Sequence, residues 1–111
     1  MFNNLKPYII AEVGQNHQGS LETALEYVSV FSDLGANAIK FQMRDNKYLF
    51  SKEKYESPYE SHNSFAPTYG EHRDCLELSH DEMLKVRELC NNLDVDFICT
   101  PFDEPSIEAL K

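Results

Sequence analysis

Cysteine is scarce in this 111-residue sequence, and long apolar runs are absent from it. The three cysteines, Cys75, Cys90 and Cys99, are odd in number and follow no metal-ligand or CxxC spacing, which argues against a disulfide framework and a zinc site. Nowhere are there about 18 consecutive apolar residues, and the N-terminus lacks the charged and apolar regions of a signal peptide. We therefore expect a soluble, cytoplasmic protein with reduced thiols and no membrane association.

Basic residues are also few. The sequence contains 10 Lys and Arg against 19 Asp and Glu, so its formal net charge is -9 and its pI is near 4.8. Proteins that bind phosphate backbones or anionic membrane surfaces need clustered Lys and Arg, and this sequence has no basic run. The charge pattern argues against a nucleic-acid partner.

A glycine-rich phosphate fingerprint is missing as well. Residues 14–19 read GQNHQG, which is not the GxGxxG of a dinucleotide-binding fold. What the sequence does contain is a short apolar segment that closes on polar side chains, and this design recurs. Such segments are residues 9–12, which end in Glu12, residues 38–42 and residues 97–103. Because parallel strands present their carboxyl ends on one face, we expect these segment ends to converge there.

The order of elements along the chain is strand, helix, strand, long connection, helix, strand. We predict the first strand at about 8–12, a helix that Ser20 caps and Gly35 terminates, and a second strand over 37–43. Another helix begins at residues 79–82. The apolar positions expected to be buried are Leu21, Leu25, Val28, Phe31 and Leu34 in the first helix, and Met83, Leu84, Val86, Leu89 and Leu93 in the second.

The connection over about 44–78 is unusually long. Its aromatic side chains stand among charges and prolines: Tyr48, Tyr55, Tyr59, Phe65 and Tyr69. Loops longer than about 12–15 residues inside a compact domain are usually functional or disordered, and the aromatic content of this one favours order. The aromatic side chains could equally pack the connection against the outside of the domain.

This order of elements implies parallel strands joined by right-handed crossovers, and the missing glycine fingerprint favours a barrel over a doubly wound sheet. A closed eight-stranded α/β barrel typically needs about 250 residues. We therefore predict an α/β fold in which residues 1–111 form the N-terminal portion of a TIM (β/α)8 barrel, roughly its first three βα units. Residues 104–111 read as a helix that has barely completed its second turn. We expect residues 1–111 alone to be inactive.

Three motifs, in this order and spacing, resemble the start of the sialic acid synthase family, which includes N-acetylneuraminate, legionaminic acid and pseudaminic acid synthases. The motifs are IAEVGQNHQG at residues 10–19, GANAIKFQ at residues 35–42 and TPFD at residues 100–103. Residues 69–73, YGEHR, are similar to a segment found in part of the family. The resemblance spans nearly the whole sequence.

The resemblance implies an enzyme that condenses phosphoenolpyruvate with an N-acylated aminosugar, such as N-acetylmannosamine or a related deoxy diacetamido sugar, to form a nonulosonic acid and phosphate. Family members use a divalent cation, Mn2+ or Mg2+, to polarise the aldehyde of the open sugar. The histidine ligands of this cation are expected beyond residue 111, and no metal ligand is assigned within residues 1–111. The remaining barrel, a C-terminal antifreeze-like domain and a homodimer are expected of the full-length protein. The aminosugar, the metal and the glycan that receives the product stay open.

The resemblance also implies roles for individual residues. Glu12 would position and deprotonate the attacking water, and Lys40 would hold the carboxylate of phosphoenolpyruvate and stabilise developing negative charge. Gln42 would hydrogen-bond hydroxyl groups of the sugar, and Thr100 would donate to phosphoenolpyruvate. Asn63 would contact substrate from the long connection if the spacing within that connection is preserved.

Three of these roles have an alternative. Glu12 and Lys40 could form an internal salt bridge, which a substrate would replace, and Gln42 could cap a nearby loop. A different reaction is a Schiff-base aldolase in which Lys40 attacks a keto acid. A non-catalytic sugar-binding module is the other alternative, although the retention of Glu12, Lys40 and Gln42 speaks against it.

The histidines do not define a site by themselves. An acid–base role for His17 is possible, but a loop histidine that fixes the backbone through hydrogen bonds is at least as reasonable. His72 and Arg73 could meet an anionic group, although a surface Arg beside acidic residues more often makes a weak, solvated ion pair. His62 and His80 are expected to be structural or exposed.

Overall fold

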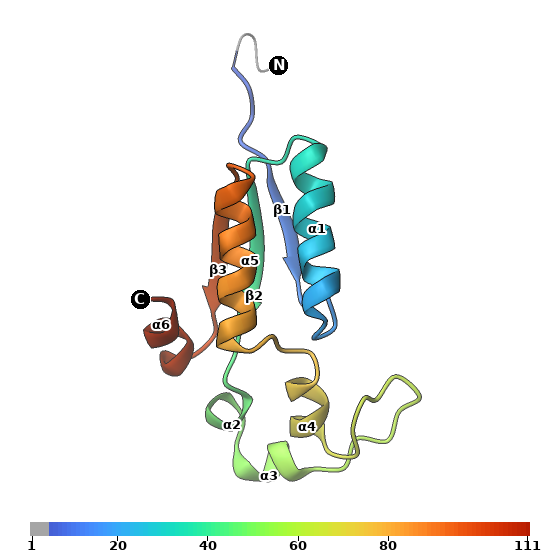
Figure 1. The fold of residues 1–111 in the computed structure, drawn as a ribbon. Coiled ribbons are helices and arrows are strands. Elements are labelled where there is room, and N and C mark those ends of the chain that lie inside the picture. Colours follow the sequence, from blue (N-terminus) through green and yellow to red (C-terminus); the bar gives the residue numbers. More distant parts are fainter. Residues whose placement is uncertain (1–4) are drawn as a thin grey trace.

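The computed structural model describes residues 5–111 and contains a three-stranded parallel sheet. The strands are β1 (Ile10–Gly14), β2 (Ala38–Met43) and β3 (Asp96–Pro101), and they pair in the order β1-β2-β3. Two long helices, α1 (Leu21–Asp33) and α5 (His80–Asn92), pack side by side over one face of the sheet, as Figure 1 shows. The predicted parallel α/β architecture is confirmed.

Side chains alternate along each strand between the helix-covered face and the open face of the sheet. On β2, Ile39, Phe41 and Met43 point to the helices, where Ile39 and Phe41 are fully buried. Burying an apolar side chain of this size stabilises the fold by about 1.5–3 kcal/mol relative to leaving it in water. Because successive strand residues point to opposite faces, Lys40 and Gln42 lie on the open face. Core packing thereby determines which side chains are free for chemistry.

Both long helices begin where the sequence predicts. The Ser20 side chain accepts a hydrogen bond from the Thr23 backbone N–H at 3.2 Å. Ser79 and Glu82 form a reciprocal capping box at the start of α5, in which each side chain accepts from the backbone N–H of the other. Gly35 follows α1 with φ +94°, a left-handed conformation that glycine adopts readily, so this end of the helix also agrees with the prediction.

The predicted buried stripes of the helices are too wide. Leu34, the C-terminal cap of α1, is 77% exposed, and Leu84 and Leu93 of the second stripe are 47% and 40% exposed. Residues outside the predicted stripes are fully buried, namely Ala24 in α1 and Cys90 in α5. A helix that packs on a sheet buries the positions nearest the strands, so apolar periodicity alone overestimates the buried set.

The long connection between β2 and α5 contains three short helices, α2 (Asn46–Leu49), α3 (Lys52–Glu56) and α4 (Tyr69–Asp74). These helices lie beyond the carboxyl ends of the strands, and α6 (Glu104–Leu110), which follows β3, lies at the same end of the sheet (Figure 1). The connection therefore borders the edge at which a parallel α/β protein presents its site.

Aromatic side chains of the connection pack largely on one another. The Tyr69 ring meets Phe50 and Tyr59 edge-on, with ring centroids 5.2 Å and 5.7 Å apart. His72 is buried against Tyr59 and Phe65, and its Nδ1 accepts from the Phe65 backbone N–H at 3.2 Å. The prediction that the long connection is ordered is confirmed, and His72 has a structural role.

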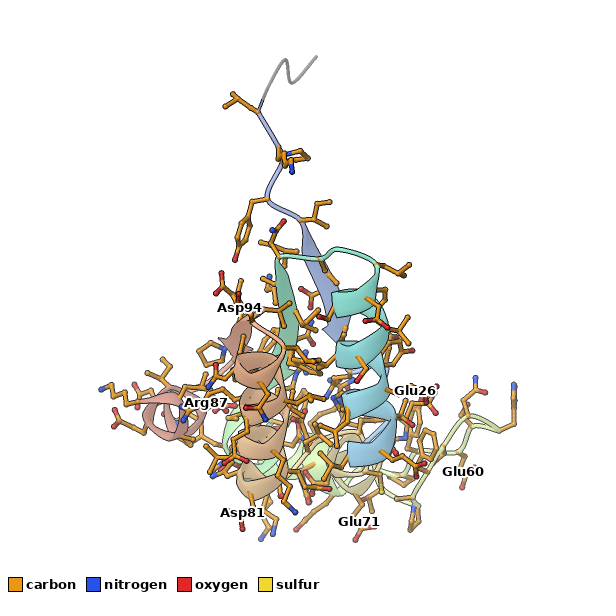
Figure 2. All side chains as sticks on the ribbon, turned by 45° about the horizontal axis from the view of Figure 1, so that its top comes forward. Glu26, Glu60, Glu71, Asp81, Arg87 and Asp94 are labelled. Atoms are coloured by element: carbon orange, nitrogen blue, oxygen red, sulfur yellow. The ribbon has the colours of Figure 1, made fainter. Side chains whose placement is uncertain are left out.

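Charged side chains lie on the outer surface of the long helices. Figure 2 shows this for Glu26 of α1 and for Asp81 and Arg87 of α5, all of which are exposed. Within residues 5–111, no helix combines the length and the apolar character that crossing a membrane requires.

Candidate active site

The open face of the sheet carries polar side chains toward the carboxyl ends of the strands. The register places Glu12 of β1 beside Lys40 of β2, and Gln42 of β2 beside Thr100 of β3. The strand neighbours of Glu12, Lys40 and Gln42 pack in the helix-covered core, as does Cys99 before Thr100, so all four point to the open face. The structure thus brings together four of the residues predicted to act on substrate.

Glu12 and Lys40 form an ion pair, with 3.4 Å between Lys40 Nζ and Glu12 Oε2. The Glu12 and Lys40 side chains are 46% and 37% exposed, so water reaches both groups. An exposed pair of this kind contributes at most about 1 kcal/mol to stability. The predicted salt bridge is confirmed, and an anionic ligand can take the place of Glu12 beside Lys40 with little loss of stability.

A β-bulge at the end of β1 brings Glu12 and Gln42 close to one point. The strand begins at Ile10, later than predicted, and its register with β2 shifts between Glu12 and Gly14. Gly14 has φ +58°, and a Cβ on it would lie 3.3 Å from Gln42 Nε2 and 3.5 Å from Glu12 Oε1. A side chain here would be strained and would crowd Gln42 Nε2, so glycine leaves this amide accessible to a ligand.

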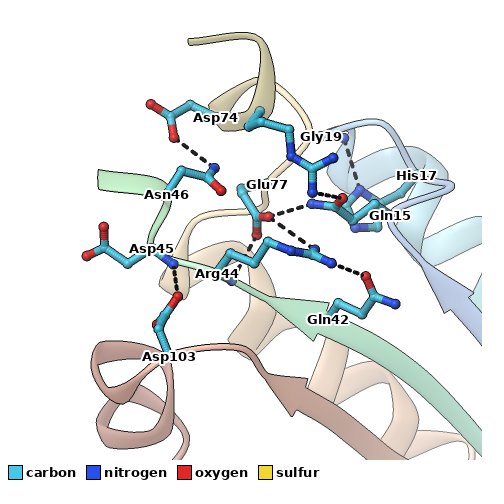
Figure 3. Close-up of polar contacts among 11 residues, drawn as sticks. Gln15, His17, Gly19, Gln42, Arg44, Asp45, Asn46, Asp74, Glu77 and Asp103 are labelled. Atoms are coloured by element: carbon cyan, nitrogen blue, oxygen red, sulfur yellow. Dashed lines mark hydrogen bonds and ion pairs between the residues drawn. The ribbon is translucent and has the colours of Figure 1, made fainter. Parts of the chain in front are cut away.

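A series of hydrogen bonds and ion pairs joins Gln42 to the long connection, as Figure 3 shows. Arg44 Nη2 donates to Gln42 Oε1 at 2.8 Å, and Arg44 Nη1 lies 3.6 Å from Glu77 Oε1. The Arg44 backbone N–H donates to Glu77 Oε2 at 3.3 Å, and Gln15 Nε2 donates to Glu77 Oε1. Arg73 Nη2 donates to Gln15 Oε1 at 3.1 Å. We call these five residues the strand-end network.

The charged groups of the strand-end network are largely shielded from water. The side chains of Arg44 and Glu77 are 10% and 12% exposed. Burial raises the pKa of the Glu77 carboxyl, and the Arg44 charge opposes this shift. Burial likewise lowers the pKa of the Arg44 guanidinium, and Glu77 opposes that shift. The guanidinium also lies 3.9 Å from the centroid of the Phe102 ring, a cation–π contact that supports the charge where water is scarce.

Other titratable groups near the strands are engaged in the core. Burial raises the pKa of the Cys99 thiol to about 12 and that of Cys90 to about 11, so neither supplies a thiolate nucleophile at neutral pH. His17 is 2% exposed, and its Nδ1 accepts from the Gly19 backbone N–H at 3.0 Å. Burial lowers the pKa of His17. The predicted alternative, a histidine that fixes its own loop, is confirmed.

A sequence profile of the NeuB family matches residues 27–111. The chain belongs to the NeuB family. Among similar proteins, the N-acetylneuraminate-9-phosphate synthases of Drosophila melanogaster and Homo sapiens are 41% and 37% identical to it, each over 103 residues. An N,N'-diacetyllegionaminic acid synthase of Legionella pneumophila is 37% identical over 116 residues. The chain spans 28% of the Drosophila protein and 33% of the Legionella protein, while 93% and 97% of the chain are covered.

Solved structures of similar proteins have the same fold over this region. The N-acetylneuraminic acid synthetase of Leptospira borgpetersenii, crystallised with citrate, gives a TM-score of 0.72 at 30% identity and covers 96% of this chain and 33% of its own. The spore coat polysaccharide biosynthesis protein SpsE of Bacillus subtilis gives a TM-score of 0.61 at 27% identity, with 96% and 27% covered. The predicted fold, part of a TIM-barrel synthase, is confirmed.

Asn63 is the predicted site residue that the structure does not bring to the strand ends. It is exposed in the loop between α3 and α4, where its backbone N–H donates to Ser61 Oγ at 3.2 Å. No hydrogen bond among the described residues joins it to the other predicted site residues, and Figure 1 shows this loop extending away from the sheet. Its contact with substrate stays a prediction from the family resemblance.

Sequence reasoning missed Arg44, Glu77 and Gln15 and expected a weak, solvated ion pair at Arg73. The expectation for Arg73 is wrong, because the end of α4 returns to the loop after β1 and the side chain becomes half-buried on Gln15. Arg44 carried a signal in the sequence, since it continues the alternation of open-face residues past the end of β2. Glu77 carried none, because its partners lie far from it in the sequence.

Proposed function

We propose that this chain is the N-terminal part of a longer synthase that condenses phosphoenolpyruvate with an N-acylated aminosugar. Carbon three of phosphoenolpyruvate bonds to the sugar aldehyde, water adds to carbon two, and phosphate leaves through C–O cleavage to give a nonulosonic acid. The observation that carries the proposal is the open-face Glu12–Lys40 pair with Gln42 beside it, in a chain of the NeuB family. The product names of the Drosophila and Legionella relatives support the same product class.

The Glu12–Lys40 pair suggests how binding prepares the reaction. When phosphoenolpyruvate binds, its carboxylate takes the place of Glu12 as the partner of the Lys40 ammonium, so that Lys40 stays paired. Glu12 is then free to accept a proton from the water that adds to carbon two. The exchange requires little energy, because the pair is exposed and contributes at most about 1 kcal/mol. Substrate binding and base activation are therefore coupled through one ion pair.

Gln42 and Thr100 supply neutral hydrogen bonds in the adjacent row of the open face. Their pairing in register places the Gln42 amide and the Thr100 hydroxyl on neighbouring strands. We assign Gln42 to the sugar and Thr100 to phosphoenolpyruvate. Lying one row nearer the strand ends than Lys40, these side chains would orient the two substrates before bond formation.

A divalent cation, Mn2+ or Mg2+, belongs to the proposal, but residues 5–111 do not fit it as a complete site. Within these residues, no group of three or more His, Cys, Asp and Glu side chains is arranged to hold a metal ion. Glu12, the carboxylate on the open face, is already paired with Lys40. We expect the ligands outside residues 5–111, and the roles given to Glu12 and Lys40 do not depend on them.

The geometry at Lys40 favours this reaction over the Schiff-base aldolase. An amine nucleophile has to be neutral, a state that enzymes obtain by burying the lysine or by placing a cation beside it. Lys40 is instead 37% exposed and pairs with a carboxylate at 3.4 Å, so it is neither buried nor beside a second cation among residues 5–111. Lys40 is therefore assigned to binding an anion.

Phosphate release by the complete synthase that contains this chain tests the proposal. The assay contains phosphoenolpyruvate, manganese and a panel of aminosugars: N-acetylmannosamine, its 6-phosphate and deoxy diacetamido relatives. The 6-phosphate is included because the Drosophila relative is named for a product phosphorylated at carbon nine. Phosphoenolpyruvate supplies the first carbons of the product, so that carbon six of the sugar becomes carbon nine. We expect release that depends on one sugar and that falls by about 10²- to 10⁴-fold in Glu12→Gln, the range for loss of a general base.

Glu26→Gln is the matched control, since Glu26 is an exposed carboxylate on the outer surface of α1 (Figure 2). It should leave phosphate release unchanged. Equal rates for Glu12→Gln and the unmodified enzyme would contradict the assigned base. Borohydride trapping of a keto acid on Lys40, without sugar-dependent phosphate release, would favour the aldolase instead.

A further inference from the structure

The amide of Gln42 has two ends of opposite character, an oxygen that accepts hydrogen bonds and an NH2 group that donates them. We infer that Arg44 is a positioning residue that holds this amide with its NH2 group toward the ligand, and that Glu77 in turn holds Arg44. The inference rests on the proposed function, because it concerns the contact between Gln42 and the aminosugar. It assigns a role to two residues that lie outside the predicted site.

The orientation of the amide follows from the chemistry of the guanidinium group, which carries five N–H donors and no acceptor. Arg44 Nη2 lies 2.8 Å from the Gln42 amide, so the end that faces Arg44 has to be the oxygen. The NH2 end then lies toward Gly14, 3.3 Å from the position of a Cβ there, with Glu12 Oε1 next to the same position. Gln42 therefore offers donors, and its ligand atom is an acceptor such as a hydroxyl or carbonyl oxygen.

Arg44 is held before any ligand binds. Its backbone N–H donates to Glu77 Oε2, its Nη1 lies 3.6 Å from Glu77 Oε1, and its guanidinium packs on the Phe102 ring. The side chain is 10% exposed, so few other rotamers are open to it. A donor fixed in this way does not have to be ordered when the sugar binds, which is the condition for a preorganised contact.

Two arginines, which can only donate, set the direction of the hydrogen bonds that the two amides of the strand-end network make. Arg73 donates to the oxygen of Gln15. The NH2 group of Gln15 in turn donates to Glu77, as Figure 3 shows. The Arg44 backbone N–H donates to Glu77 and the guanidinium pairs with the same carboxylate, while Arg44 Nη2 donates to the oxygen of Gln42. Turning either amide over would place two donors against each other, which leaves half-buried polar groups unsatisfied. Arg44 thus sets the orientation of Gln42, and Glu77 pairs with Arg44.

Steady-state kinetics of the complete synthase test the inference, with KM determined separately for the aminosugar and for phosphoenolpyruvate. In Arg44→Met, which keeps the length of the side chain but removes its donors, KM for the sugar should rise by about 3- to 10-fold, the equivalent of one net hydrogen bond. KM for phosphoenolpyruvate should stay unchanged. Arg44→Lys retains a donor and should recover part of the loss. Arg87→Met, on the exposed surface of α5, removes the same charge and should match the unmodified enzyme.

Gln42→Glu provides a second, independent variant. It keeps an oxygen toward Arg44 and replaces the NH2 group by an acceptor, so KM for the sugar should rise by more than in Arg44→Met. Because this variant preserves the partner of Arg44, it remains informative even if Arg44→Met does not fold, which thermal melting will show. An unchanged sugar KM in Arg44→Met, or in Gln42→Glu, would overturn the inference.

Failure of the proposed function has a different signature. If the unmodified synthase releases no phosphate with any sugar of the panel, the proposed function is contradicted, and crystal structures of the unmodified protein and Arg44→Met then decide the inference. A Gln42 side chain that leaves its rotamer when Arg44 is replaced supports a positioning role. A Gln42 side chain in the same rotamer in both structures overturns it.

Discussion

Replacing Gly19 by alanine should destabilise the protein by more than its backbone conformation alone explains. Gly19 ends the polar loop after β1. Residues 75–77, which we call the return segment of the long connection, pack against it. A Cβ on Gly19 would overlap the backbone carbonyl oxygen of Cys75, which no change of rotamer can move aside. Gly19 also has φ +77°, a conformation in which an L-residue is strained. Either the loop or the end of the connection has to shift.

The expected magnitude has two parts. The left-handed backbone conformation contributes about 1–2 kcal/mol. The overlap with a backbone atom contributes a further 1–3 kcal/mol, roughly the effect of overpacking a site that cannot relax freely. Together they predict a loss of about 2–5 kcal/mol in the free energy of unfolding.

Gly35→Ala is the matched control. Gly35 has φ +94°, but a Cβ there would meet no atom within 4 Å, so this variant tests the backbone contribution alone. Urea unfolding of the unmodified protein and of both variants, followed side by side, gives the difference that belongs to the contact with Cys75. Equal destabilisation by the two substitutions would refute the reasoning.

Burial lowers the pKa of His17 below its usual 6.5, so as the pH falls through that value the unfolded chain binds a proton that the folded protein does not, and stability should fall. His17→Asn keeps an acceptor for the Gly19 N–H without titrating, and it should flatten that part of a stability-versus-pH curve measured by urea unfolding; an unchanged slope would point to another group. Gly70→Ala should lower the thermal unfolding temperature, because a Cβ on Gly70 would overlap the Tyr55 ring between α3 and α4. A melting curve identical to that of the unmodified protein would mean that Tyr55 rotates away. A polypeptide limited to residues 1–111 should melt without a sharp transition and release no phosphate, because the open face of its sheet is uncovered; a sharp two-state transition of the monomer would contradict this.

The strand-end positions of Glu12, Lys40, Gln42 and Thr100 could be predicted from the sequence for one physical reason. Each lies near the end of a short apolar strand, and the apolar neighbours of each have to face the helices. Once the strands are parallel, these side chains share one face, and the Glu12–Lys40 pair follows from their register. Local pattern and global fold agree here, as they do in most of a natural sequence.

The parts that could not be predicted depend on contacts between distant segments. The shift of β1 to Ile10 depends on where pairing with β2 begins, and the bulge before Gly14 depends on the same register. The exposure of Leu84 depends on how closely α5 lies over the sheet, and the apolar periodicity of the α5 sequence does not determine this. Glu77 stands in an unremarkable sequence context, and only the return of the chain from α4 brings it to Arg44.

The long connection therefore has two parts with different relations to the candidate active site. The loop that carries Asn63 is exposed and extends away from the sheet, so substitutions there leave the strand ends unchanged unless the loop itself contacts a ligand. The return segment packs against Gly19 through the backbone of Cys75, and it pairs with Arg44, just past the end of β2, through Glu77. A change in the return segment reaches Gln42 through Glu77 and Arg44. Glu77 belongs to the machinery of the site as much as the strand residues do, although it lies on none of the strands.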